Sequence, residues 1–174
     1  MREPTVAPSD SAQGLFERAR FLAARGEVGG ARDALDAALR AEPSHLGAHL
    51  LRARLLLEDR EGEQALSLFD HTVLTWPGSA EARNERARCL HALGRHEAAL
   101  AEAERARALL DEADNLSQVG PVYLTLVWCL REMRRFREAL LLADEGLARV
   151  PDAILANWAA TVEEELAEAQ KEEC

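Results

Sequence analysis

The sequence lacks long apolar runs and contains few cysteine residues. No stretch approaches the roughly eighteen uninterrupted apolar residues that span a bilayer, and the opening MREPTVAPSDSAQ has no apolar core of a signal peptide. Cys89, Cys129 and Cys174 lie far apart without CxxC spacing, which argues against a disulfide framework and against a zinc site. We therefore expect a cytoplasmic protein that does not insert into a membrane.

Aromatic residues and lysine are also scarce. Only 5% of the 174 residues are aromatic, whereas alanine and leucine abound, so we expect one all-α protein with a core of small and aliphatic side chains. Lys171 is the only lysine, and the remaining basic residues are arginine. The formal net charge is −10, which disfavours binding to nucleic acid or to anionic membranes. Any cationic site must therefore be local.

The sequence repeats itself at a fixed period, which overrides local patterns when a fold is predicted. Three similar segments lie 34 residues apart: ERARFL from Glu17, LRARLL from Leu51 and ERARCL from Glu85. Alanine recurs with spacings of 34, 34 and 40 at Ala31, Ala65, Ala99 and Ala139. Proline follows at Pro43, Pro77 and Pro151, with Asp111 in the third repeat.

Each repeat is predicted to form a helix, a short turn and a second helix that stops at proline. The predicted helices cover 12–25, 28–41, 46–59, 62–75, 80–93, 96–112, 118–133, 136–149 and 153–170. The corresponding domain organisation is a flexible segment 1–11, repeats at about 12–45, 46–79, 80–113 and 120–153 with an insert at 114–119, and a final helix with an acidic tail over 152–174. Because the third repeat lacks its proline, its second helix is expected to run long.

The repeat resembles the tetratricopeptide repeat, a 34-residue helix pair with the pattern Trp-x2-Leu-Gly-x2-Tyr, then Ala-x3-Phe, then Pro. The second-helix pattern matches best, in Ala65, Phe69 and Pro77. The first-helix pattern is weaker, because the position of the tryptophan holds Leu15, His49, Arg83 and Tyr123. The resemblance implies a right-handed α-solenoid of about four helix-turn-helix repeats plus a C-terminal capping helix. A dimer contact is the alternative role of that last helix.

The repeated Arg-Ala-Arg motif divides into two sets, because residues two apart lie on different faces of a helix. One set, Arg18, Arg52 and Arg86, is expected to support the scaffold. By the resemblance, the second set lies on the concave surface formed by the first helices. The partner-binding groove predicted there consists of Phe16, Arg20, Leu50, Arg54, Leu57, Arg88, Leu124 and Trp128. Arginine beside apolar side chains is typical of a protein-binding hot spot, so we expect a partner segment with acidic and apolar residues.

The alternative is that these arginines are neutralised on their own helices. Glu17, Glu58 and Glu85 lie three or four residues from Arg20, Arg54 and Arg88, respectively. The resemblance does not extend to the co-chaperone subclass, which clamps a C-terminal carboxylate with lysines, asparagines and an arginine. The corresponding places here hold Phe16, Arg20, Leu51, Glu81 and Glu85.

The sequence shows no arrangement typical of an enzyme. His45 and His49 are four residues apart but lack an HExxH motif, and Gly29-Gly30 is not a phosphate-binding loop. We expect no catalytic residue, metal or cofactor. The predicted function is a non-catalytic adaptor or assembly factor that binds protein as a monomer or weak dimer. The alternative function is a small secretion chaperone of the type III class, which holds a secreted substrate.

Overall fold

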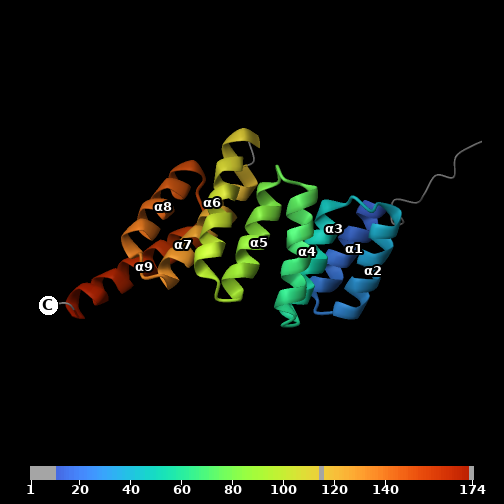
Figure 1. Ribbon diagram of the computed structural model, residues 1–174, viewed down its shortest axis with the longest axis horizontal. Helices are drawn as coiled ribbons and strands as arrows, with labels where there is room; N and C mark the ends of the chain where they lie inside the picture. Colours follow the sequence, from blue (N-terminus) through green and yellow to red (C-terminus); the bar gives the residue numbers. More distant parts are fainter. Residues whose placement is uncertain (1–10, 114–115, 173–174) are drawn as a thin grey trace, which may run out of the picture. The chain divides into compact units, whose positions relative to one another are not determined.

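A computed structural model of the chain describes residues 11–113 and 116–172, and all regular structure in these ranges is helical (Figure 1). The chain divides into an N-terminal unit, Met1–Thr75, and a C-terminal unit, Trp76–Cys174. The N-terminal unit contains α1 (Ala12–Ala24), α2 (Val28–Ala41), α3 (Leu46–Glu58) and α4 (Gly62–Thr75). The C-terminal unit contains α5 (Ala80–Ala92), α6 (His96–Ala113), the 3-10 helix η2 (Leu116–Gln118), α7 (Val119–Glu132), α8 (Phe136–Arg149) and α9 (Ala153–Glu172).

The predicted helices are confirmed, and their ends agree with the structure to within two residues. Helix α6 has 18 residues where α2, α4 and α8 have 14, as the missing proline of the third repeat indicated. Within the predicted insert, residues 116–118 form η2, whereas 114 and 115 lie outside the described residues. Most of the predicted flexible segment, residues 1–10, and the end of the acidic tail, 173–174, also lie outside them.

The turn inside each helix pair has the same backbone conformation. One residue per turn has a positive φ, namely Gly26, Arg60, Gly94 and Arg134, with φ of 76°, 64°, 74° and 57°. The following amide donates to the carbonyl five residues earlier, for example Glu27 to Leu22 and Arg135 to Leu130. This Schellman arrangement satisfies the last carbonyls of the first helix and reverses the chain. The turn thus recurs at the 34- and 40-residue spacing of the sequence.

The starts of three first helices also share one device, a side chain that caps the helix. Ser11, His45 and Ser79 lie 34 residues apart, and each accepts a hydrogen bond from the backbone amide three residues later, at 3.0 to 3.2 Å. Such caps satisfy amides that have no partner within the helix. Asp152 caps α9 in the same way, because its Oδ1 accepts from the amides of Ile154 and Leu155 at 2.9 Å.

In the N-terminal unit, each helix packs against its sequence neighbour, and the first helices α1 and α3 also contact each other. Small residues let the helices approach closely. The ring of Phe16 lies against Gly47, where an added Cβ would be only 2.8 Å from the ring. One buried cluster of this unit contains Ala19, Ala31, Ala34, Leu35, Ala38, Ala48, Leu51 and Leu55. Phe69 of α4 is also fully buried.

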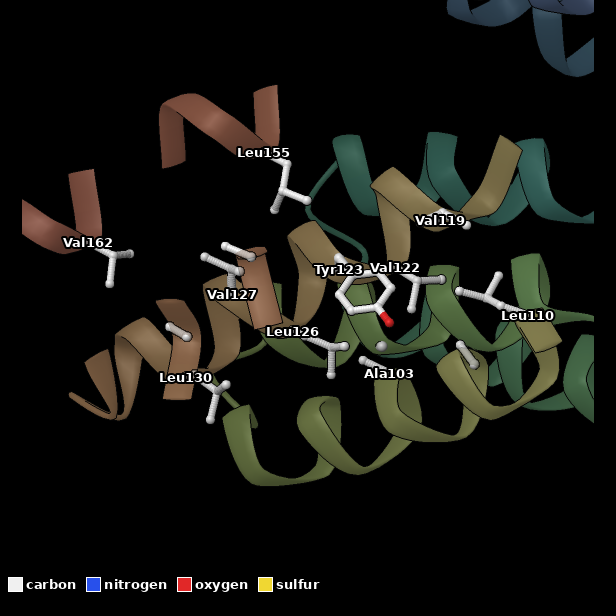
Figure 2. Packing of buried hydrophobic residues seen from close by; sticks show 14 of the residues in the cluster. Ala103, Leu110, Val119, Val122, Tyr123, Leu126, Val127, Leu130, Leu155 and Val162 are labelled. Atoms are coloured by element: carbon white, nitrogen blue, oxygen red, sulfur yellow. The ribbon is translucent and has the colours of Figure 1, made fainter. Parts of the chain in front are cut away.

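The C-terminal unit follows the same order, with α5 packed on α6, α7 on α8, and α7 also in contact with α5 and α9. Figure 2 shows its core, which gathers aliphatic side chains around the buried Tyr123. Helix α9 contributes Leu155 and Val162, both fully buried, and leaves Glu163 and Glu164 exposed. The last helix therefore covers the open face of this unit, which confirms the predicted cap.

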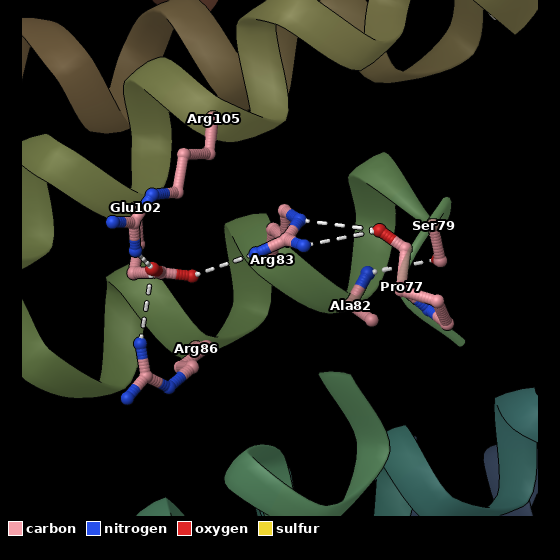
Figure 3. Close-up of polar contacts among 7 residues, drawn as sticks. All are labelled: Pro77, Ser79, Ala82, Arg83, Arg86, Glu102 and Arg105. Carbon is pink, nitrogen blue, oxygen red and sulfur yellow. Dashed lines mark hydrogen bonds and ion pairs between the residues drawn. The ribbon is translucent and has the colours of Figure 1, made fainter. Parts of the chain in front are cut away.

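A buried carboxylate replaces an apolar side chain in the third repeat (Figure 3). Glu102 is only 2% exposed and forms ion pairs with Arg83 at 3.5 Å, with Arg86 at 3.2 Å and with Arg105. Arg83 also donates from Nε and Nη2 to the carbonyl of Pro77, at 3.3 and 3.2 Å. The arginines thus join α5, α6 and the preceding turn through one buried acidic group, as a buried charge requires.

Candidate partner-binding pockets

The N-terminal unit has a pocket of about 320 Å³ between α1 and α3. It contains three of the five predicted groove residues of this unit, Phe16, Arg20 and Arg54. Its other lining residues are Ala23, Ala24, Leu51, Leu55 and Glu58. The lining thus combines aromatic and aliphatic side chains with two arginines and one glutamate.

Arg20 is held at this pocket by two interactions on its own helix. Its Nη1 lies 3.1 Å from Glu17 Oε2, and its guanidinium lies 5.9 Å from the centre of the Phe16 ring. The side chain is nevertheless 60% exposed. An exposed pair of this kind contributes little to stability, so Arg20 can exchange its partner at small cost.

Two predicted groove residues do not line this pocket. Leu50 is fully buried, so the prediction that it is available to a partner is wrong. Leu57 is half-buried and lies outside the lining. Leu51 and Leu55 line the pocket instead, although they too are largely buried, at 9% and 2% exposed. Helix α3 carries leucine on several faces, so the hydrophobic pattern alone does not fix which leucine faces the pocket.

The C-terminal unit has a smaller pocket of about 190 Å³, formed by α5, α7 and the start of α9. It contains all three predicted groove residues of this unit, Arg88, Leu124 and Trp128. The other lining residues are Pro121, Thr125, Asp152 and Ile154. Ile154 is 60% exposed although it is a large apolar residue, so the pocket rim presents apolar surface to solvent.

Sequence reasoning missed the contribution of α9 to this site. The Trp128 ring makes an edge contact with Trp158 at 5.9 Å between ring centres, and it lies 6.1 Å from the ring of His91. The guanidinium of Arg131 lies 5.5 Å from the centre of the Trp158 ring, while its Nη2 pairs with Glu165 at 2.5 Å. Only the presence of tryptophan in the last helix hinted at this cluster.

The structure pairs two of the three groove arginines with the carboxylates that the neutralisation alternative named. Arg88 Nη1 lies 2.9 Å from Glu85 Oε1. Arg20 Nη1 lies 3.1 Å from Glu17 Oε2. Arg54 and Glu58 line the same pocket. In the other arginine set, Arg52 lies 3.6 Å from Asp36, and Arg86 pairs with Glu102, as expected for scaffold residues.

Burial shifts the pKa values of two side chains near the C-terminal pocket, His91 and Cys129. Desolvation lowers the pKa of His91, and the neighbouring His96 lowers this pKa further. Burial raises the pKa of the Cys129 thiol to about 12, so this cysteine stays protonated and is not activated as a nucleophile.

The histidines four residues apart, His45 and His49, both serve structural roles. His45 Nδ1 accepts from the Ala48 amide, and its Nε2 lies 3.1 Å from the side-chain oxygen of Gln13. His49 Nε2 donates to the carbonyl of Pro43. Within residues 11–113 and 116–172, no group of three or more histidine, cysteine or acidic side chains is placed to hold a metal ion.

Paired helices with a recurring turn and a recurring cap define a helical-repeat protein. The tetratricopeptide repeat family model matches residues 16–73 and 50–114, which together cover more than half of the sequence. The chain belongs to the tetratricopeptide repeat family. Proteins of this family are typically non-catalytic modules for protein interaction. No curated protein sequence matches the chain significantly, and none of the described helices is long and apolar enough to cross a membrane.

Solved structures of other proteins share the fold. PilF of Pseudomonas aeruginosa has a TM-score of 0.77 at 18% identity, over 90% of this chain and 69% of that one. The thermophilic repeat protein TTC0263 of Thermus thermophilus has a TM-score of 0.74 at 22% identity, over 87% and 81%. YrrB, described as a repeat protein with an unusual peptide-binding site, has a TM-score of 0.62 at 18% identity, over 88% and 76%. At these identities the similarity concerns the fold alone.

Proposed function

We propose that the protein is a non-catalytic adaptor or assembly factor that binds a partner segment containing acidic and apolar residues. The supporting observation is that six of the eight groove residues predicted from the sequence cluster around two pockets, three in each unit. Both pockets combine an exposed arginine with an aromatic ring, Phe16 or Trp128, and arginine and aromatic residues are enriched at protein interfaces. The peptide-binding site described for YrrB is consistent with this use of the fold.

The ion pairs at the pockets are compatible with binding. Arg20 and Arg88 keep exposed side chains, at 60% and 43%, beside carboxylates of their own helices. An acidic partner residue would share or replace Glu17 at Arg20, where both groups are exposed. At Arg88 it would add to the pair, because Glu85 is largely buried. The binding energy would come mainly from apolar contacts at Phe16 and Trp128, with arginine providing orientation.

The proposal is tested by affinity capture of the native partner followed by mass spectrometry, with single variants of each pocket. Phe16→Ala and Arg54→Gln should reduce capture through the N-terminal pocket, and Trp128→Ala through the C-terminal pocket. Glutamine is chosen over glutamate because it removes the positive charge without adding a repulsive one. Circular dichroism should show unchanged helix content for all three variants.

Matched controls separate pocket binding from general surface effects. Arg40→Gln removes an exposed arginine, and Leu141→Ala removes an apolar side chain that is 69% exposed, both outside the pockets. These variants should capture the partner as the unmodified protein does. Equal capture by all pocket variants would exclude the proposed surface. A captured partner that is itself a secreted protein would favour the secretion chaperone over the adaptor.

A further inference from the structure

Four arginines surround the turn between α7 and α8, in a protein with an excess of negative charge. A pocket of about 430 Å³ lies between this turn and the second half of α9. Its lining combines three of the arginines, one glutamate and one glutamine with three apolar residues. The lining residues are Arg134, Arg135, Phe136, Arg137, Glu138, Leu166, Ala169 and Gln170. None of them lines either partner-binding pocket described above.

Among the described side chains, two of the four arginines around this turn form ion pairs with glutamates, and two do not. Arg135 is occupied by Glu138, at 2.6 Å, and Arg131 on the neighbouring wall by Glu165. Arg137 forms no ion pair with the side chains described within residues 11–110 and 116–171. The guanidinium of Arg134 instead lies 5.6 Å from the centre of the Phe136 ring. Arg134 and Arg137 are therefore exposed positive charges without a described ion-pair partner, next to Phe136.

Acidic groups face this turn from three helices, Glu132 of α7, Glu138 of α8 and several glutamates of α9. Glu165 and Glu168 line an adjacent pocket together with Arg131 and Arg134. Glu163 and Glu164 are exposed on the same helix. A long polyanion such as nucleic acid, or an anionic membrane, would meet all of these carboxylates, whereas a single carboxylate in the pocket would meet only Glu138, which is paired with Arg135. The charge distribution thus favours a short acidic segment of a protein.

Arg134 occupies this position at a cost to the backbone. Its φ of 57° is left-handed, and the equivalent positions in the first and third repeats hold Gly26 and Gly94. Arg60 adopts the same conformation in the second repeat, so the conformation alone does not identify a site. The two arginines differ in that Arg134 lines the pocket and Arg60 does not. This difference makes Arg60 an internal control.

We propose that this pocket binds a carboxylate-bearing segment of a protein partner. An aspartate or glutamate of the segment pairs with Arg134 and Arg137, and an adjoining apolar side chain packs on Phe136 and Leu166. The volume lies within the range of ligand pockets and accommodates a few side chains. The site is separate from the two groove pockets, so it does not depend on the function proposed for them.

The probe is a fluorescein-labelled peptide of alternating glutamate and leucine, with both ends blocked, titrated at low salt and followed by fluorescence anisotropy. A second peptide carries glutamine in place of glutamate. The full-length protein should bind the glutamate peptide and not the glutamine peptide. Arg134→Gly and Arg137→Gln should each weaken binding about tenfold, because a charge-assisted hydrogen bond is lost.

Arg60→Gly provides the matched control for the glycine substitution. Both glycine variants relieve the left-handed conformation, so both should melt at or above the temperature of the unmodified protein. Only Arg134→Gly should lose peptide binding, which separates the lost guanidinium from any loss of folding. Arg54→Gln and Trp128→Ala, at the groove pockets, should bind this peptide normally.

Several results would overturn the proposal. They are unchanged affinity of Arg134→Gly, equal binding of the two peptides, and absence of binding at millimolar protein. Tighter binding of a single-stranded oligonucleotide or of phosphatidylserine vesicles than of the peptide would assign the arginines to a different class of partner. Amide chemical-shift changes outside residues 131–138 and 165–170 would place the peptide elsewhere.

Discussion

His49 Nε2 lies 2.8 Å from the carbonyl oxygen of Pro43, six residues earlier, and donates a hydrogen bond to it. Arg83 makes the same contact with Pro77 one repeat later. Both residues stand where the family often has tryptophan. The first helix of each of these repeats is thereby fastened to the preceding turn by a polar side chain rather than by ring packing.

This relationship predicts a measurable contribution to stability. His49→Phe keeps a ring of similar size but removes the donor, so it should lower the free energy of unfolding by about 1 kcal/mol, the usual net value of a hydrogen bond. Urea unfolding followed by circular dichroism measures the difference. An unchanged unfolding midpoint would mean that water satisfies the Pro43 carbonyl equally well.

The buried Glu102 predicts opposite outcomes for its removal and for the removal of its partners. Glu102→Leu introduces the residue found at the equivalent positions Leu68 and Leu142, so stability should change by less than about 1 kcal/mol. The double substitution Arg83→Met with Arg86→Met leaves a buried carboxylate poorly compensated and should cost about 2 kcal/mol or more. Urea unfolding of both variants checks the contrast, which fails if Glu102→Leu is the more damaging change.

Gly146 is expected to tolerate no side chain. An added Cβ would lie 2.6 Å from Tyr123 and 2.9 Å from Leu155, both fully buried. Gly146→Ala should therefore destabilise the protein by about 1 to 3 kcal/mol through overpacking. Gly29, in α2, has open space at the same atom, so Gly29→Ala should be neutral or slightly stabilising. Thermal unfolding of the two alanine variants distinguishes crowding from a general effect of alanine.

The lowered pKa of His91 predicts a dependence of stability on pH. The folded state holds this imidazole neutral, because of burial and the neighbouring His96, with Glu132 acting in the opposite direction. The unfolded chain takes up the proton first as pH falls below 6.5, the ordinary value for histidine. His91 therefore removes stability between pH 6.5 and its lower folded pKa, and its effect is absent above that window. His91→Gln should flatten the decline between about pH 7 and pH 5.5 in thermal unfolding; parallel curves would show that other groups cause it.

The fold was largely predictable because helix starts, turns and stops are written locally in the sequence. Pro43 and Pro77 end helices, and the spacing of Ala31, Ala65 and Ala99 marks the packed face. The candidate site was less predictable, because the rotation of each helix about its axis decides which side chains face a pocket. Leu50 and Leu51 are neighbours of one type, yet only Leu51 lines a pocket.

Contacts between distant segments were beyond sequence reasoning. Ile154 and Trp158 join the C-terminal pocket and its aromatic cluster only because α9 packs across α7. Arg134 and Arg135 lie between the predicted helices 118–133 and 136–149, but their pocket also requires Leu166 and Ala169 from the last helix. No periodic pattern encodes which face of a terminal helix meets which turn.

The caps at Ser11, His45 and Ser79 have a consequence for how the chain reaches its structure. Each of these repeats carries its own start signal, and its two helices are joined by only a few residues, so the first contacts close short loops. Loop closure of this kind costs little entropy and favours rapid folding. Nucleation is therefore available at three separate places along the sequence, and folding can proceed outward from whichever pair of helices forms first.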